Sequence, residues 1–170
     1  AEQIKSPSFS LSLSESAWEV LRMLRVVLAD DENKVILLMQ KLIDWEALGY
    51  EIAGTANDGL RALELVREKQ PHLLITDVRM PGCDGIELIQ RAKALQPKLH
   101  FIVISGYRKF EYAQNALKYG VEDYLLKPFR DQELTHAVAR VCRKMQPLPA
   151  APAQQEKEPE VSGYVRQAMD

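Results

Sequence analysis

Six polar or charged side chains stand at the ends of short apolar runs, where they could act together. They are Asp30, Asp31, Glu32, Asp77, Ser105 and Lys127. In an open sheet of parallel strands, the carboxyl ends of the strands form one edge, and ligands bind at that edge. If each run is such a strand, the fold brings several carboxylates, a hydroxyl and an ammonium group to one place.

Carboxylates held close together repel one another and need compensating positive charge. Hard oxygen ligands without a convergent His or Cys favour Mg²⁺, which leaves coordination positions to water and phosphate. The acidic run from Ala29 to Glu32 is unlike a phosphate cradle, which uses glycine-rich backbone at a helix N-terminus. We therefore expect Mg²⁺ or a similar divalent cation among these acids.

The apolar runs that precede these residues have the composition of strands buried on both faces. Five are predicted, over residues 25–30, 51–56, 72–77, 100–105 and 123–127. The amphipathic stretches between and after them predict helices over residues 33–47, 58–69, 84–96, 110–119 and 131–145. Five strands alternating with five helices predict a doubly wound α/β domain with a five-stranded parallel sheet.

Helical periodicity assigns a buried face to each of the first two helices. For the helix at 33–47, the face is made of Val35, Met39, Leu42 and Ile43. For the helix at 58–69, it is made of Leu60, Leu63 and Val66. Asn57 is the expected N-cap of the second helix, and Gly120 is the expected stop after the helix at 110–119.

The overall charge is nearly balanced, since 22 Lys and Arg face 24 Asp and Glu in 170 residues. A dedicated nucleic-acid-binding domain would carry a basic excess, so this balance argues against one. No apolar run has the about 18 residues of a membrane span, and no secretory signal is recognisable. Cys83 and Cys142 lack metal-type spacing and suit a reducing compartment, so we expect a cytoplasmic protein with no membrane attachment.

Composition divides the chain into a central domain, residues 24–146, and two flanking parts. Residues 1–23 begin with alternating serines and continue with a capping-box spacing, which leaves open a leader, native or added, or a short extra helix. Residues 147–159 are rich in Pro, Ala, Gln and Glu, which predicts a linker. Residues 160–170 carry apolar positions at helical spacing, which predicts the start of an amphipathic helix that is cut short and belongs to a second domain.

Four motifs, in this order and spacing, resemble the receiver domain of bacterial two-component response regulators over about residues 25–145. They are Leu28-Ala-Asp-Asp-Glu32, Ile75-Thr-Asp-Val-Arg-Met-Pro81 with Gly85, Ile104-Ser-Gly106, and Asp123-Tyr-Leu-Leu-Lys-Pro128. The resemblance implies a flavodoxin-like topology with strand order 2-1-3-4-5. It also implies a signalling module rather than an enzyme, whose chemistry is limited to its own phosphorylation and dephosphorylation.

The resemblance implies a role for each motif residue. Asp77 would be the phospho-acceptor, and a sensor histidine kinase would supply the phosphoryl group. Asp31 and Asp77 would bind Mg²⁺ directly together with the backbone carbonyl of Arg79, and Asp30 would act mainly through water. Lys127 would pair with the phosphoryl oxygens.

A switch follows from the same resemblance. Ser105 would hydrogen-bond a phosphoryl oxygen, and Tyr124 would turn inward in response. The surface formed by residues 110–140 would then change, and phosphorylated chains would form a homodimer through it. The Lys127–Pro128 peptide bond matches one that is commonly cis in this family.

A narrower resemblance is to receivers of the YesN-like group, whose output is an AraC-type helix-turn-helix domain. It rests on Ser105-Gly-Tyr107, Phe110-Glu-Tyr-Ala113 and Tyr124-Leu-Leu-Lys-Pro128. It implies transcription regulation, with residues 160–170 as the start of a truncated output-domain helix and with DNA bound only through that output domain.

Two other functions would use related residues. Phosphatases of the haloacid dehalogenase type combine an aspartyl nucleophile with Mg²⁺ and lysine, but their nucleophile belongs to an Asp-x-Asp motif on the first strand. A flavodoxin-like cofactor binder would want a hydroxyl- and glycine-rich loop where Ala29-Asp-Asp-Glu32 stands. Cys83, close to Asp77 in sequence, is expected to be an incidental exposed thiol.

Overall fold

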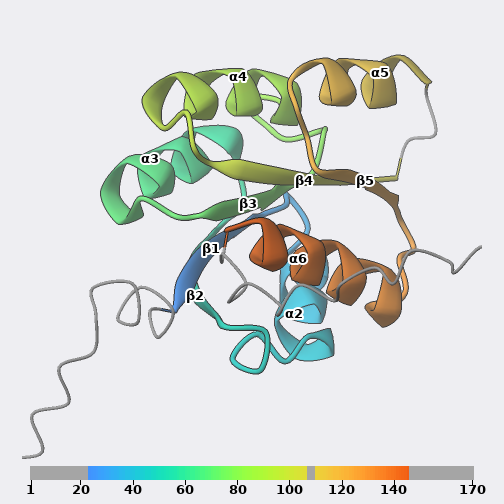
Figure 1. The fold of residues 1–170 in the computed structure, drawn as a ribbon. Coiled ribbons are helices and arrows are strands. Elements are labelled where there is room, and N and C mark those ends of the chain that lie inside the picture. The colour runs from blue at the N-terminus through green and yellow to red at the C-terminus, as the bar shows by residue number, and fades with distance from the viewer. Residues whose placement is uncertain (1–22, 107–109, 146–170) are drawn as a thin grey trace, which may run out of the picture.

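The strands form because each is a short run rich in Val, Ile and Leu that can bury both of its faces. The computed structural model describes residues 23–106 and 110–145, and in this part of the chain five strands form one sheet (Figure 1). They are β1 (Leu24–Ala29), β2 (Tyr50–Ala56), β3 (Leu73–Thr76), β4 (His100–Ser105) and β5 (Asp123–Leu126). All neighbours pair in parallel in the order β2-β1-β3-β4-β5, which confirms the predicted topology.

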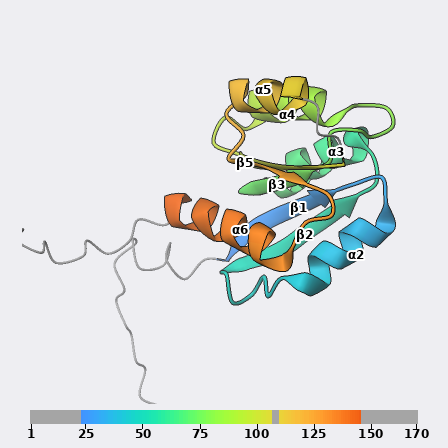
Figure 2. The same ribbon diagram turned by 90° about the vertical axis from the view of Figure 1, so that its right-hand side faces the viewer.

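Helices cover both faces of this sheet (Figure 2). In the described ranges they are α2 (Asn33–Leu42), α3 (Gly59–Lys69), α4 (Gly85–Leu95), α5 (Phe110–Lys118) and α6 (Asp131–Met145). Helices α2 and α6 pack on one face, and α3, α4 and α5 pack on the other. The predicted doubly wound α/β fold with five helices is therefore confirmed.

Strand β1 shows how the two cores hold the sheet. Successive side chains of a strand point to opposite faces. Accordingly Val26 and Leu28 join the core under α2 and α6, whereas Val27 and Ala29 join the core under α3, α4 and α5. Because β1 lies between β2 and β3 and is buried on both faces, the residues that follow it are held in a fixed position.

Helix α2 ends at Leu42, so the prediction of a helix to residue 47 was wrong. Ile43 is already extended. Two side chains then compete with helical hydrogen bonding. The Asp44 carboxylate accepts from the backbone N–H of Ala47 at 3.1 Å, and the Trp45 indole N–H donates to the carbonyl of Met39 at 3.1 Å.

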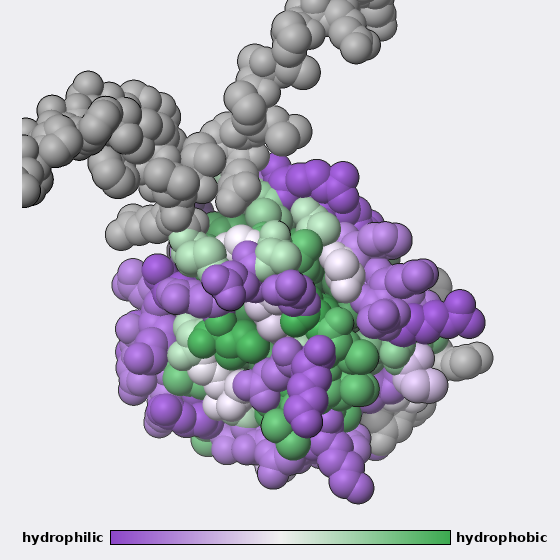
Figure 3. All heavy atoms as spheres, turned by 90° about the horizontal axis from the view of Figure 1, so that it is seen from below, coloured by the Kyte–Doolittle hydropathy of each residue, from purple (hydrophilic) through white to green (hydrophobic). Residues whose placement is uncertain are grey.

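The predicted faces of α2 and α3 were each wrong at one leucine. Leu42 is 38% exposed and Leu60 is 50% exposed. Ile36 takes a place in the core under α2, and Ala62 and Leu65 do so under α3. Figure 3 shows the α2 and α6 side of the molecule, where apolar surface lies between hydrophilic side chains. Periodicity could not choose between the face with Leu42 and the face with Ile36, because both are apolar.

The N-cap of α3 is Asp58 and not Asn57. The Asp58 carboxylate accepts from the backbone N–H of Arg61 at 2.8 Å. The Asn57 amide donates instead to the Asp30 carbonyl at 3.3 Å and to Asn33 Oδ1 at 2.6 Å, so it ties together the ends of β1 and β2. Gly120 follows α5 with a φ of 74°, which confirms it as the stop.

Three predicted segments lie outside the described residues: nearly all of residues 1–23, the linker at 147–159 and the helix at 160–170. Within the described ranges, no helix has both the length and the apolar character needed to span a membrane.

Candidate functional site

Asp77 stands directly after β3 and is held by backbone hydrogen bonds. Its N–H donates to the carbonyl of Ala29 at 3.0 Å, which aligns it with the end of β1. Its carboxylate oxygen Oδ1 accepts from the N–H of Val78 at 2.7 Å and from the N–H of Arg79 at 3.4 Å. These backbone donors have no signature in the sequence, which is why residue types alone did not reveal them. They keep the carboxylate of Asp77 in one orientation.

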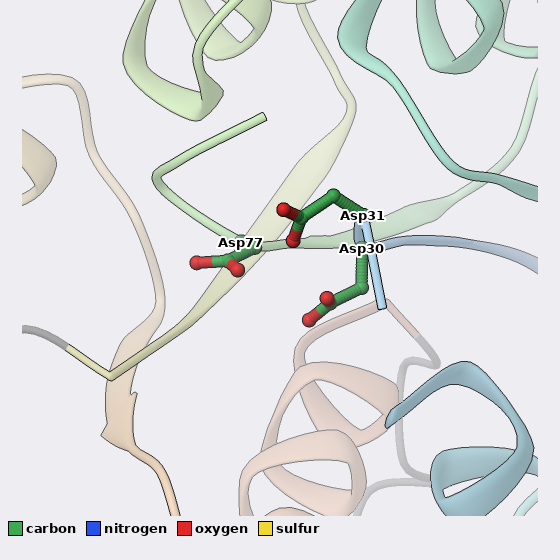
Figure 4. Close-up of side chains that lie close together, drawn as sticks. All are labelled: Asp30, Asp31 and Asp77. Carbon is green, nitrogen blue, oxygen red and sulfur yellow. The ribbon is translucent and has the colours of Figure 1, made fainter. Parts of the chain in front are cut away.

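Asp30 and Asp31 follow β1 and approach Asp77 from two sides (Figure 4). Asp30 is 1% exposed, and its Oδ1 accepts from the N–H of Glu32 at 2.9 Å. Asp31 is exposed. One carboxylate oxygen from each of Asp30, Asp31 and Asp77 lies within 4.8 Å of the others. The predicted convergence of these three acids is therefore observed.

Lys127 follows β5 and reaches across the same edge. Its Nζ lies 2.8 Å from Asp30 Oδ2 and 3.0 Å from Asp77 Oδ2, and it lies 3.6 Å from Glu32 Oε1. Its backbone N–H donates to the carbonyl of Ser105 at 2.8 Å. The peptide bond between Lys127 and Pro128 is cis, as the resemblance predicts.

The charges at this edge do not balance. Burial raises the pKa of Asp30 from 3.8 to about 6, although the hydrogen bond from Lys127 opposes the rise. Burial would lower the pKa of Lys127, but its hydrogen bonds to Asp30 and Asp77 outweigh this and raise the pKa above 10.5. Lys127 therefore stays protonated. Within the described part of this edge, its ammonium group contacts Asp30, Glu32 and Asp77, and Asp31 lies beside them. A set of oxygen ligands with excess negative charge fits a hard divalent cation.

Ser105 and Tyr124 belong to β4 and β5, the two strands on the side of β3 away from β1. Ser105 is the buried last residue of β4, the strand next to β3. Tyr124, in β5, is partly buried and packs against the core under α3, α4 and α5. Their switching roles, and the role of the Arg79 carbonyl, stay predictions.

Cys83 is buried, so the expectation of an exposed thiol was wrong. It packs in the core under α3, α4 and α5, and burial raises the pKa of its thiol. The carbonyl of Cys83 lies only 2.1 Å from the position that a Cβ at Gly59 would occupy. Cys83 is therefore a packing residue of the loop between β3 and α4.

Gly85, the first residue of α4, allows that loop to fold back on Asp77. A Cβ at Gly85 would lie 2.0 Å from the carbonyl oxygen of Asp77. The Gly85→Ala variant must shift backbone, so we expect it to lose about 1–3 kcal/mol of unfolding free energy in denaturant titrations. Gly106→Ala is the matched control, because a Cβ there meets no atom of the described residues within 4 Å. Equal stabilities of the two variants would contradict this account of the loop.

The sequence of residues 26–139 matches the family of response regulator receiver domains. The chain is 45% identical over 123 residues to the uncharacterized transcriptional regulatory protein YesN of Bacillus subtilis, covering 72% of this chain and 33% of that protein. It is 35% identical to the transcriptional regulatory protein HptR of Staphylococcus aureus, covering 72% of this chain and 48% of that protein. The chain thus spans about a third to a half of the length of these relatives.

A solved structure is also similar. It is the REC domain of AraT, a response regulator from Geobacillus stearothermophilus. The two share 40% sequence identity and superpose with a TM-score of 0.69, over 72% of this chain and 95% of that chain.

Proposed function

The chain belongs to the family of response regulator receiver domains, and from this membership we propose that Asp77 accepts a phosphoryl group from a sensor histidine kinase in a Mg²⁺-dependent reaction. The observation that carries the proposal is the contact of Lys127 with both Asp30 and Asp77 beside a third acid, Asp31. Phosphoryl transfer needs positioning and charge neutralisation more than acid–base groups, and this edge supplies both.

The metal in this proposal is held by the acids. Asp31 and Asp77 would hold it directly together with the carbonyl of Arg79, and Asp30 would act mainly through water. The proximity of the carboxylates of Asp30, Asp31 and Asp77 to one another, and the fact that all of these ligands are oxygens, support this assignment. When bound, Mg²⁺ supplies positive charge to the phosphoryl oxygens.

The chain's own residues perform the rest. Hydrogen bonds from Val78 and Arg79 orient Asp77 so that one carboxylate oxygen can attack phosphorus. The ammonium group of Lys127 neutralises charge on the transferring group. Ser105 then hydrogen-bonds a phosphoryl oxygen, and Tyr124 moves inward, which changes the surface of residues 110–140.

The raised pKa of Asp30 makes metal binding depend on pH. Below about pH 6 the folded protein carries a proton on Asp30 that a divalent cation must displace, and above it the carboxylate is already ionised. Affinity for Mg²⁺ should therefore be constant above that pH and fall by up to about tenfold per pH unit below it. Calorimetric titrations on both sides of pH 6 measure this. Asp30→Asn should bind Mg²⁺ more weakly and lose the pH step, and a wild-type affinity that does not change with pH would contradict the assignment.

One experiment tests the phospho-acceptor function against the phosphatase. The protein is incubated with Mg²⁺ and phosphoramidate, and its intact mass and the free phosphate are followed. We expect one labile phosphoryl group per chain and none after chelation of Mg²⁺. Steady turnover of an added phosphoester would favour a haloacid dehalogenase-type phosphatase, which the comparisons do not support. In that fold the nucleophile lies on the first strand, whereas Asp77 follows β3.

We propose that phosphorylation controls an AraC-type DNA-binding domain, whose first helix starts within residues 160–170, in a cytoplasmic transcription regulator. The similarity to YesN and HptR, which are both named as transcriptional regulatory proteins, supports this. In a chain that includes this domain, phosphorylation should raise DNA affinity in binding titrations.

We also propose that the phosphorylated receiver dimerises through residues 110–140. Support comes from Leu117 on α5 and Leu126 on β5, which are 70% and 37% exposed. Sedimentation of the phosphorylated chain should show a dimer, and Leu117→Glu should weaken it.

A further inference from the structure

One asparagine side chain holds both ends of the turn that carries the acids. The turn runs from Asp30, directly after β1, to Asn33, the first residue of α2. Nδ2 of Asn57, the residue after β2, donates to the carbonyl of Asp30 at 3.3 Å and to Oδ1 of Asn33 at 2.6 Å. An amide nitrogen carries two N–H donors, so these two acceptors use both of them. Asn57 therefore has no donor left for Asp77 or for a phosphoryl group.

These contacts lie where the backbone pairing of β1 and β2 stops. The parallel ladder ends at Ala29 and Ala56, and the N–H of Asp30 adds a bond of 3.0 Å to the carbonyl of Ala56. The side chain of Asn57 then adds a further link between the two chain segments. Helix α2 gives no such support from its own N-cap, because the Glu32 side chain makes no capping hydrogen bond in the described structure. The path of the turn beyond the ladder therefore depends on Asn57.

The acids on this turn need a restraint. Asp31 is exposed, so the backbone of the turn decides where its carboxylate lies. Carboxylate oxygens of Asp30, Asp31 and Asp77 converge to within 4.8 Å, and like charges so close together repel. Before a cation binds, this repulsion favours a turn that has moved away from Asp77. A side chain that keeps the turn in place lowers the free-energy cost of rearrangement when a cation binds.

We propose that Asn57 is a positioning residue for the metal, which holds Asp30 and Asp31 in the arrangement that Mg²⁺ requires. The role rests on the proposed function, and Asn57 lies outside the four motifs of the family resemblance. Both partners of the amide nitrogen are oxygen acceptors, so the role needs a side chain with two N–H donors on one nitrogen.

The test separates affinity for the metal from the rate of transfer. Asn57→Ala should weaken Mg²⁺ binding about tenfold in calorimetric titrations, as the loss of a group that orients metal ligands typically does. The Mg²⁺ concentration that gives half-maximal phosphorylation by phosphoramidate should rise by the same factor. The rate at saturating Mg²⁺ should stay within about twofold of wild type, because Asp77 and Lys127 are unchanged.

A second measurement needs no metal. Inside the turn, the N–H of Glu32 donates to Asp30 Oδ1 at 2.9 Å. Hydrogen exchange of this amide in the metal-free protein, followed by NMR, should be at least about threefold faster in Asn57→Ala than in the wild type.

Arg25→Gln is the matched control, because Arg25 makes a comparable link at the other end of β1. Its side chain donates to the carbonyls of Lys69 and Gln70, each at 3.0 Å. It lies about 16 Å along the strand from the acids, beyond the reach of its charge at physiological salt. The control should lose stability in denaturant titrations and keep the wild-type Mg²⁺ affinity and the wild-type exchange of the Glu32 amide.

A double variant tests whether the two contacts act as one unit. Asn33→Ala removes one of the two acceptors, so it should weaken Mg²⁺ binding less than Asn57→Ala does. The double variant should bind Mg²⁺ as Asn57→Ala does, because Asn33 acts through Asn57.

Four outcomes would overturn the inference: an unchanged Mg²⁺ affinity in Asn57→Ala, a loss in the rate at saturating Mg²⁺ as large as the loss in affinity, an unchanged exchange of the Glu32 amide, or additive effects of the two substitutions. A wild-type protein that neither bound Mg²⁺ nor reacted with phosphoramidate would be a different result, because it would overturn the proposed function itself.

Discussion

Replacing Asp77 with Asn should abolish phosphoryl transfer to this protein. The amide has the shape of the carboxylate and can still accept from the N–H of Val78, so the loop keeps its structure. It lacks the negatively charged oxygen that attacks phosphorus. With Mg²⁺ and phosphoramidate, we expect no mass increase in Asp77→Asn within the time that labels the wild type fully.

Asp44→Asn is the control for this variant. Asp44 is exposed in the turn after α2, and an Asn there can still accept from Ala47. The control should be labelled at the wild-type rate. A phosphoryl group on Asp77→Asn would show that another residue is the acceptor and would contradict the assignment.

Replacing Lys127 with Met should slow phosphorylation strongly while metal binding persists. Lys127 Nζ lies 3.0 Å from Asp77 Oδ2, and the lysine side chain is only 16% exposed. Its positive charge therefore lies next to the attacking carboxylate, where little water screens it. Removing one such stabilising group typically costs about 10²–10³ in rate. Mg²⁺ affinity should be unchanged or higher, because a competing cation has left the acids. Quenched time courses with phosphoramidate measure the phosphorylation rate, and calorimetric titrations with Mg²⁺ measure the metal affinity.

Lys41→Met changes the net charge equally on the last turn of α2 and serves as the control. Its rate should stay within about twofold of wild type. If Lys127→Met were phosphorylated as fast as this control, the lysine would have no part in the transfer.

Much of the fold could be predicted because the cores repeat a simple pattern. Runs such as that of β4, His100–Ser105, are too apolar to lie anywhere but between two layers. The end of α2 could not be predicted, because it depends on the Trp45 indole reaching the carbonyl of Met39. The exposure of Leu42 depends likewise on how α2 is turned against the sheet, which periodicity leaves open.

The sequence predicted which residues form the site, but not how they are arranged or how deeply each is buried. The rule that ligands gather at the carboxyl ends of parallel strands identified Asp30, Asp31 and Asp77. Adjacent residues in the sequence nevertheless have opposite environments, since Asp30 is buried and Asp31 is exposed. The burial of Asp30 raises the pKa of its carboxyl group to about 6. Only the path of the chain after β1 decides it, and the residue types carry no information about that path.

The hydrogen bonds from the N–H groups of Val78 and Arg79 to Asp77 could not be predicted from the sequence either. They arise because Gly85 lets the loop turn tightly enough to hydrogen-bond its N–H to the carbonyl of Val78, at 2.8 Å. The sequence contained Gly85 as part of the family resemblance, but the reason for a glycine there is the carbonyl oxygen of Asp77. The prediction that Cys83 is exposed was wrong for the same reason, because the turn that brings Gly85 to Asp77 also buries this thiol.

The most direct test of the account is to locate the phosphoryl group chemically. The wild-type protein, labelled with phosphoramidate and Mg²⁺, is reduced with borohydride, which converts an aspartyl phosphate to homoserine, and its peptides are sequenced by mass spectrometry. We expect homoserine at position 77 and unmodified Asp30 and Asp31. Homoserine at either of those acids, or a phosphoryl group that borohydride does not remove, would contradict the assignment of Asp77 as the phospho-acceptor.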